Sequence, residues 1–319
     1  MMQVPITIII PTMNRPKSLD RTLKCFFEGE CTPNQIVIID QSQTQEKRNG
    51  NKDVLRKYKD FCNSQVYEYQ QVPSSTKARN LGVSKVENEI VVFSDDDIDV
   101  NVDTLKNVYA IMQDENIAMI AGIDEFTSSS STNIGYLLGT KSYRKRNIGH
   151  VTLSMLGRYP DKVQKRTETQ WAQGYFFVVR KSLMDKWNCR WDENLTSYAY
   201  AEDLDFSFGY YKHAHAEGMK CILDPSVKVK HLATKEYRIP STKSIYMYII
   251  NRAYLSHKHG MGFSGLLASS WCNFWRLVQN VSVRENFKTL ANAIWCSLRY
   301  YKEINMGKLD YDKFIKSKW

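Results

Sequence analysis

The chain has 319 residues, and 43% of them are hydrophobic, enough to build a sizeable core in one large domain or two. The opening residues are not typical of a signal peptide, and the first apolar run, Pro5–Pro11, is too short to span a bilayer. The seven cysteines are odd in number, irregularly spaced and without a Cys-x-x-Cys pair, which argues against a disulfide framework and predicts reduced thiols in a cytoplasmic protein. The net charge of +10 raises the question of an anionic partner.

Strand-like and helix-like segments alternate along the first 123 residues. Strands are predicted at Val4–Pro11, Gln35–Asp40, Val66–Val72, Glu89–Ser94 and Ile117–Ile123. Helices are predicted from Pro16 onward and over Lys52–Phe61, Ser74–Val86 and about 102–115. This alternation predicts an α/β fold with a doubly wound, largely parallel sheet and helices on both faces. In such sheets ligands bind beyond the carboxyl ends of the strands.

The second half of the chain is less regular. Residues 124–170 are polar and lack periodicity, which predicts a long loop region near the ligand site. Further strands are predicted at Gly174–Val179 and Cys221–His231, and helices from Lys181 and over Ala201–Gly218. Because the pattern is helical from about Ser241 to the end, we expect a sheet domain over residues 1–240 and a helical region over 241–319.

Three consecutive carboxylates, Asp95-Asp96-Asp97, follow the buried strand Glu89–Ser94. Three like charges close together repel one another, and a divalent cation would offset that repulsion while bridging the carboxylates to a phosphate. The triplet therefore predicts a metal–diphosphate site. A solvated acidic turn or a helix N-cap is the ordinary alternative, because aspartate is favoured there.

Three further polar positions lie at the ends of predicted strands or at the start of a predicted helix: Asp40, the pair Glu202-Asp203, and His231. Each has an ordinary explanation when taken alone. Asp40 fits a turn, the acidic pair fits the first turn of a helix, and the histidine fits a surface or core position. Their joint occurrence with the triplet on one α/β frame favours a common site.

An ordered set of segments resembles family-2 inverting glycosyltransferases with the GT-A fold, of the bacterial surface-polysaccharide type. The matching segments are Ile8–Pro16, Val37–Ser42, Lys77–Gly82, Val91–Asp97, Trp191–Asp205 and Val229–His231. They occur in the family's order across roughly the first 235 residues. The resemblance implies a GT-A sheet, which is Rossmann-like, followed by a helical C-terminal extension.

The resemblance also implies a nucleotide-sugar site. Pro11, Thr12 and Asn14 correspond to the loop that lines the nucleotide pocket. Asp40 corresponds to the acid that binds the base or ribose, and Arg79 to the basic residue that holds the diphosphate. One departure is Gln41, where many members carry a second acid, so base recognition is left open.

The triplet takes unequal roles under the same resemblance. Asp95 corresponds to an acid that faces the nucleotide, and Asp96 to the spacer beside it in the donor site. Asp97 and His231 correspond to ligands of Mn²⁺ or Mg²⁺.

The resemblance assigns the catalytic base to Asp203, which would accept the proton of the acceptor hydroxyl. Glu202 is the rival, and helical spacing turns adjacent residues about 100° apart, so only one of the pair is expected to face the acceptor. Glu202 or Asp205 is expected to orient the base or the acceptor.

The C-terminal region is basic and aromatic. Residues 241–319 contain 12 Lys and Arg against 4 Asp and Glu, and four of the seven tryptophans. Apolar residues recur there at helical spacing: Leu266, Leu267, Trp271, Phe274, Trp275 and Val278. Such a helix would pack on the sheet domain or a second subunit, or it would lie in the plane of a membrane with a basic face.

We therefore expect a cytoplasmic enzyme, peripheral on the inner face of the cell membrane. It would move a sugar from a nucleotide-sugar to a glycan acceptor, which we expect to be lipid-linked, in surface polysaccharide assembly. The sequence fits a homo-oligomer as well as a monomer. A nucleotidyltransferase is an alternative, because it also uses strand-tip acids and a metal. A non-catalytic glycan-binding scaffold on the same fold is another. Nucleic acid is not expected as a partner, since the charge lies mainly outside the α/β part and no nucleic-acid motif is present.

Overall fold

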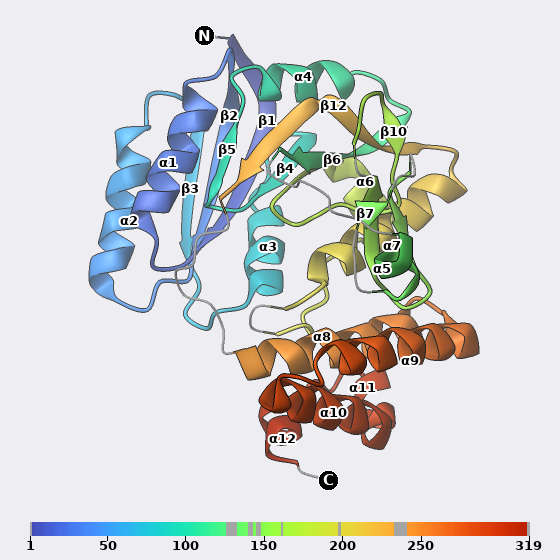
Figure 1. Cartoon of the computed structure of the whole chain (residues 1–319). Helices are drawn as coiled ribbons and strands as arrows, with labels where there is room; N and C mark the ends of the chain where they lie inside the picture. Colours follow the sequence, from blue (N-terminus) through green and yellow to red (C-terminus); the bar gives the residue numbers. More distant parts are fainter. Residues whose placement is uncertain are drawn as a thin grey trace.

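The structure is a computed structural model that describes residues 2–125, 133–139, 143–144, 148–160, 162–196, 199–232 and 241–317. A central sheet carries helices on both of its faces, and a group of helices lies beyond one end of it (Figure 1). The N-terminus lies at the sheet, and the C-terminus lies in the helical group at the opposite end of the molecule.

The main sheet is mixed in direction. Its strands are β1 (Met2–Thr12), β2 (Cys31–Asp40), β3 (Ser64–Tyr69), β4 (Ile90–Ser94), β5 (Ile98–Val100), β6 (Ile117–Asp124), β10 (Thr167–Glu168), β11 (Phe176–Arg180) and β12 (Lys220–His231). The order is β10-β12-β6-β11-β4-β1-β2-β3, with β5 paired to β12. Strands β1 to β4 pair in parallel, whereas β11 runs antiparallel to both β4 and β6. The prediction of a largely parallel sheet was wrong here, because an apolar run identifies a buried strand but not its direction.

Most helices of the sheet part cover its two faces. They are α1 (Pro16–Phe27), α2 (Gln45–Lys57), α3 (Ser75–Val83), α4 (Thr104–Ile111), α5 (Asn133–Leu137), α6 (Lys181–Lys186) and α7 (Glu202–Ala216). Helices α1, α2 and α4 share one apolar cluster with the sheet, and α3, α6 and α7 share the other. The prediction of helices on both faces is therefore confirmed.

Alternation along the strands explains the two clusters. Ile8 and Ile10 of β1 point to the cluster of α1, whereas Ile9 points to the cluster of α3. Successive side chains of a strand face opposite sides, so a strand covered on both faces is apolar throughout. Gly82 lets α3 approach closely, because a Cβ there would lie 2.4 Å from Cγ2 of Ile9.

Two predicted segments differ from the structure. Helix α2 begins at Gln45 rather than at Lys52, because the Thr44 side chain accepts a hydrogen bond from the Lys47 amide and caps it. The polar first turns hide this helix from a search for apolar periodicity. The predicted loop region contains β8 (His150–Val151) and β9 (Gly157–Pro160), which pair with each other. A third strand, β7 (Tyr143–Arg144), joins β9, and residues 126–132, 140–142, 145–147 and 161 lie outside the described part.

The C-terminal region is helical, as predicted. It consists of α8 (Ser241–Lys258), α9 (Gly262–Gln279), α10 (Arg284–Arg299), α11 (Tyr301–Asn305) and α12 (Tyr311–Lys316). Helix α8 is buried and contacts the sheet part directly, since Arg252 Nε donates to the Ser154 carbonyl (2.8 Å) and Asn251 Nδ2 to the Tyr200 carbonyl (2.8 Å). The division at residue 240 stays a prediction. Among the described residues, no helix has the length and apolarity needed to cross a membrane.

Candidate active site

The triplet Asp95-Asp96-Asp97 follows β4 at the carboxyl end of the parallel strands. Asp96 points inward and is fully buried. It accepts a hydrogen bond from Thr12 Oγ1 (2.5 Å), and Nη2 of Arg15 lies 2.5 Å from its Oδ1. Burial raises the pKa of Asp96 to about 7, although Arg15 opposes that shift. Asp96 therefore ties the triplet to the loop after β1, and its predicted place in the donor site stays a prediction.

Asp95, Asp97 and His231 form a cluster. Each offers one ligand atom, and these atoms all lie within 4.8 Å of one another. His231 Nε2 is 3.5 Å from Asp97 Oδ1, and its ring stacks on Tyr175 with centroids 5.1 Å apart. Burial alone would lower the pKa of His231, but the hydrogen bond to Asp97 and the nearby carboxylates raise it. Two carboxylates and an imidazole fit a divalent cation such as Mn²⁺ or Mg²⁺.

Arg79 on α3 connects this cluster to the acids of α7. Its Nη2 lies 3.2 Å from Asp95 Oδ1, and its Nη1 lies 2.8 Å from Glu202 Oε1. The guanidinium also lies over the Trp191 ring, 4.5 Å from the centroid. Burial raises the pKa of Glu202 to about 8, and Arg79 counteracts part of that rise. One buried cation therefore contacts both groups of carboxylates.

Asp203 is held by backbone amides at the start of α7. Its Oδ2 accepts a hydrogen bond from the Gly174 amide (2.8 Å), and its Oδ1 accepts one from the Leu204 amide (2.8 Å). Burial raises the pKa of Asp203, and these two amides oppose the rise. Gly174 permits the approach, because a Cβ there would lie 3.1 Å from Asp203 Cβ and 3.4 Å from Nη2 of Arg79.

The residues predicted to line the nucleotide pocket lie along the ends of β1 and β2. Asp40 is fully buried and accepts hydrogen bonds from Tyr67 Oη (2.6 Å) and the Ser42 amide (2.7 Å). Asn14 adopts a left-handed backbone (φ 60°), which lets its Oδ1 accept from the Gln43 amide (2.9 Å).

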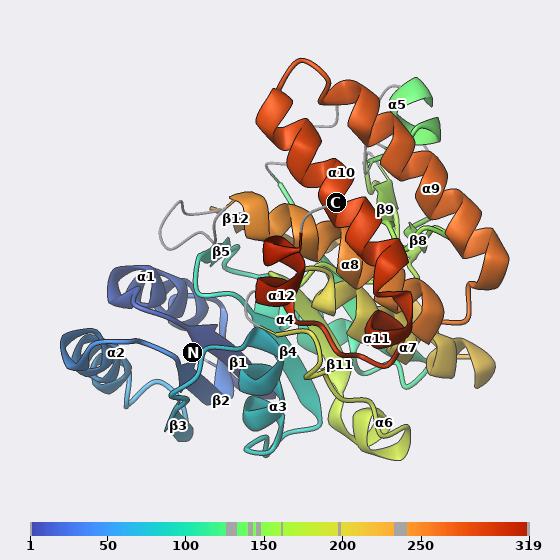
Figure 2. The ribbon, with the colours of Figure 1, turned by 90° about the horizontal axis from the view of Figure 1, so that it is seen from below.

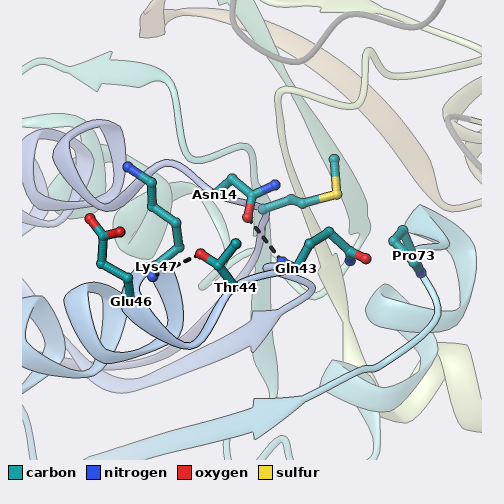
Figure 3. A pocket seen from close by; sticks show the side chains of 7 residues that line it. Asn14, Gln43, Thr44, Glu46, Lys47 and Pro73 are labelled. Atoms are coloured by element: carbon teal, nitrogen blue, oxygen red, sulfur yellow. Dashed lines mark hydrogen bonds between the residues drawn. The ribbon is translucent and has the colours of Figure 1, made fainter.

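A hollow lies beside Asn14 and Gln43. Thr44, Glu46, Lys47, Met13 and Pro73 complete its lining (Figure 3). Gln41, the departure from the family pattern, turns away toward α3, where its Oε1 accepts from the Ser74 amide (2.6 Å). Pro11 sits at the end of β1 opposite Ile39.

The structure gathers most of the predicted site residues. The members in mutual contact are Asp95, Asp97, His231, Arg79, Glu202 and, through Gly174, Asp203. Asp205 is an exception, because it is 3% exposed and binds Lys258 and His259 rather than its neighbours in the site. Among the residues that the structure describes, no contact supports the prediction that Asp205 orients the base or the acceptor.

Sequence reasoning missed Arg15 and Tyr175 as parts of the site, and it expected Gly174, with Gln173 and Trp171, only as a wall of the acceptor site. Arg15 follows Asn14 in the loop after β1, at the same sheet edge as the triplet, and a cation beside three acids was a usable signal. Tyr175 carried no such signal, and neither did the hydrogen bond from Gly174 to Asp203, because both contacts depend on β11 entering between β4 and β6.

The family follows from the comparison with known sequences. The family model described as Glycosyl transferase family 2 matches residues 7–187, which is more than half of the chain. The chain belongs to glycosyl transferase family 2. A search of curated proteins gave no match.

Solved structures agree on the fold. S. aureus TarS 1–349 in complex with UDP-GlcNAc is 16% identical with a TM-score of 0.59, and the match covers 98% of this chain and 90% of TarS 1–349. The mannosyltransferase PcManGT from Pyrobaculum calidifontis, in complex with GDP-Man and Mn²⁺, is 15% identical with a TM-score of 0.52, over 98% of this chain and 85% of PcManGT. At these identities the likeness shows the fold, and the predicted GT-A fold is confirmed.

Proposed function

We propose that this family-2 member transfers a sugar from a nucleotide-sugar to a hydroxyl of a glycan acceptor, with inversion and with the help of a divalent metal ion. The observation that carries the proposal is the position of Arg79 between Asp95 and Glu202. It brings a metal-type cluster, suited to a leaving diphosphate, next to a carboxylate pair suited to an acceptor hydroxyl.

Asp95, Asp97 and His231 would hold the metal ion. A bound Mn²⁺ or Mg²⁺ would supply Lewis-acid stabilisation of the negative charge that develops on the leaving diphosphate. Arg79 is a buried cation beside this cluster and would stabilise the same charge. Its contact with the Trp191 ring and with Gly174 fixes where the guanidinium lies.

Asp203 would act as the general base. Two backbone amides favour its ionised form and fix its orientation, which a base needs when it accepts the proton of the attacking hydroxyl. Glu202 is less suited, because its Oε1 is already paired with Arg79 Nη1 (2.8 Å) and burial raises its pKa, which disfavours its ionised form. A single displacement assisted by one base inverts the anomeric carbon.

A nucleoside diphosphate is the proposed carrier of the sugar. The structural relatives support this, because TarS and PcManGT are described in complex with UDP-GlcNAc and GDP-Man, the latter with Mn²⁺. Pro11, Thr12, Asn14 and Asp40 would form or support the nucleotide pocket, next to the hollow at Gln43.

A lipid-linked glycan in surface polysaccharide assembly, at the cytoplasmic face of the membrane, is the proposed acceptor setting. In this view residues 1–240 are the catalytic domain and residues 241–319 serve association with a membrane or a second subunit. The basic charge of the C-terminal region supports this assignment.

A thermal-shift screen of UDP-, GDP- and dTDP-sugars with and without Mn²⁺ tests the proposal, because a ligand that binds the native state raises its stability. We expect one nucleotide-sugar to raise the melting temperature only with metal, and slow release of nucleoside diphosphate from it. Stabilisation by a nucleoside triphosphate with release of pyrophosphate would instead favour a nucleotidyltransferase. Binding without any turnover, in the presence of a panel of glycan acceptors, would favour the scaffold.

A further inference from the structure

Helix α9 carries a continuous apolar face that is open to solvent. Its members are 43% to 72% exposed: Phe263, Leu266, Leu267, Trp271, Phe274 and Val278. At about 100° per residue they fall within an arc of roughly 140°. We infer that this face, here called the α9 face, binds the surface of an anionic lipid bilayer. The inference does not depend on the proposed reaction.

Neighbouring segments extend the α9 face. Trp271 Nε1 donates to the Leu137 carbonyl (3.1 Å), which places α5 beside α9, and Figure 2 shows the two helices side by side at the edge of the molecule. Ile134 and Leu137 of α5 are each 70% exposed. A patch of this extent marks an interaction site.

The opposite side of α9 is held by the protein. Gly265 and Cys272 are buried there, and Cys272 packs so closely on Gly139 that a Cβ on that glycine would lie 2.3 Å from its Sγ. Arg276 lies over the Tyr248 ring of α8, 3.8 Å from the centroid. Since one side is anchored and the other is open, α9 would lie flat on a bilayer with its apolar side chains at the headgroup level.

The positive charge of the segments around the α9 face indicates an anionic partner. Residues 241–284 contain five Lys and Arg and no Asp or Glu, although the whole chain has 34 acidic residues. The sequence from Asn133 to Pro160 likewise contains five Lys and Arg and no acid. All charged residues of both segments are therefore basic, but Arg158 and Arg252 are buried and Lys258 is paired with Asp192 and Asp205. In the described part of these segments, the positive charge that solvent reaches comes from Lys243, Arg276 and Arg284. Anionic headgroups attract such a surface, whereas a symmetric contact with a second copy would bring like charges together.

Vesicle sedimentation tests the inference with the full chain. We expect the protein to sediment with phosphatidylglycerol–phosphatidylcholine vesicles and to bind pure phosphatidylcholine at least tenfold more weakly. The double variant Leu267→Glu, Phe274→Glu should lose at least tenfold in partitioning to the anionic vesicles. Both positions are exposed, and glutamate is tolerated in helices, so the fold should persist. Circular dichroism and thermal melting check that it does.

The matched control is Met2→Glu with Val102→Glu, two apolar positions of similar exposure (56% and 61%) in the sheet part. This control should sediment as the unaltered protein does. Failure of the unaltered protein to bind anionic vesicles would overturn the inference, as would equal losses in both double variants. A concentration-dependent dimer that only the α9 variant abolishes, without vesicle binding, would instead make the α9 face a contact between copies. Donor-induced thermal stabilisation in solution, measured on the same proteins, reports separately on the proposed function.

Discussion

The negative charge of the two groups of carboxylates in the site is compensated in different ways. The triplet after β4 is countered by charged side chains from three separate elements: Arg15 from the loop after β1, Arg79 from α3 and His231 from β12. Asp203, in contrast, receives two backbone amides, from Gly174 and from its own helix. The triplet is therefore balanced by groups on rotatable side chains, and Asp203 by groups that the fold fixes.

This difference separates two tasks. A carboxylate whose partners are side chains can exchange one of them for a ligand at modest cost, which suits a site that binds a metal and a diphosphate and then releases them. A carboxylate held by backbone amides keeps its orientation throughout a cycle, which suits a proton acceptor. The following experiments break one side of this contrast at a time.

The largest effect is expected for Asp203→Asn. Removing the base should lower turnover of the donor about a thousandfold, because general-base catalysis contributes roughly 10²–10⁴ in rate. Donor affinity should stay within about twofold, since the amide side chain retains the shape of the carboxylate. Glu202→Gln is the matched variant and should cost less than about tenfold if Glu202 is not the base. The reverse order of the two losses would transfer the role to Glu202.

Asp205 extends the contrast to a third acid of the same helix, two residues after Asp203. It is buried, and its oxygens lie 2.7 Å from Lys258 Nζ and 2.8 Å from His259 Nε2, so it joins α7 to the end of α8. Asp205→Ala should lower the free energy of unfolding by about 3 kcal/mol, because it leaves Lys258 without one of its two carboxylate partners in a buried network. Urea titration measures the loss. Asp185→Ala, which removes a surface acid, should cost less than about 1 kcal/mol.

Asp97→Ala tests the triplet, whose charge is compensated by side chains. Losing a ligand should weaken Mn²⁺-dependent donor binding by about a hundredfold or more, because even changes behind the ligands cost roughly 10–100-fold in metal affinity. Calorimetric titration of the donor with and without Mn²⁺ measures this. Asp99→Ala is the control: Asp99 lies two residues on but binds Arg21 at the surface. Identical titrations for Asp97→Ala and the unaltered protein would remove Asp97 from the metal site.

Much of this contrast could be predicted from the sequence, for a physical reason. Strand-tip positions such as Asp40, Asp95 and His231 are fixed by the apolar runs before them, and the ends of such runs are visible in the sequence. The pairing of Arg79 with Glu202 could not be predicted, because the two residues are 123 positions apart and belong to helices on the same face of the sheet. The antiparallel direction of β11, on which the hydrogen bond from Gly174 to Asp203 depends, could not be predicted either.

The backbone conformation at the start of α7 also could not be predicted from the sequence. Ala201, the residue before α7, has a left-handed backbone (φ 67°), a conformation that an alanine rarely adopts. Sequence reasoning expects glycine or asparagine there. The strain is located immediately before Glu202 and Asp203, where backbone strain is often associated with function.

The smallest effect, counted per pH unit, concerns the pH dependence of stability without metal. Burial raises the pKa of Glu202 from 4.5 to about 8, so between these values the folded protein holds a proton that the unfolded chain releases. The contribution of Glu202 to stability is therefore greatest below about pH 4.5 and falls as the pH rises toward 8, by at most about 1.4 kcal/mol per pH unit. Glu202→Gln should flatten the fall when urea unfolding is measured in chelator at several pH values. Asp203 should contribute less to that slope, because its two amides oppose the shift that burial produces. An unchanged slope in Glu202→Gln would mean that Arg79 alone keeps Glu202 ionised, and the contrast between the two neighbouring acids would then rest on geometry rather than on charge.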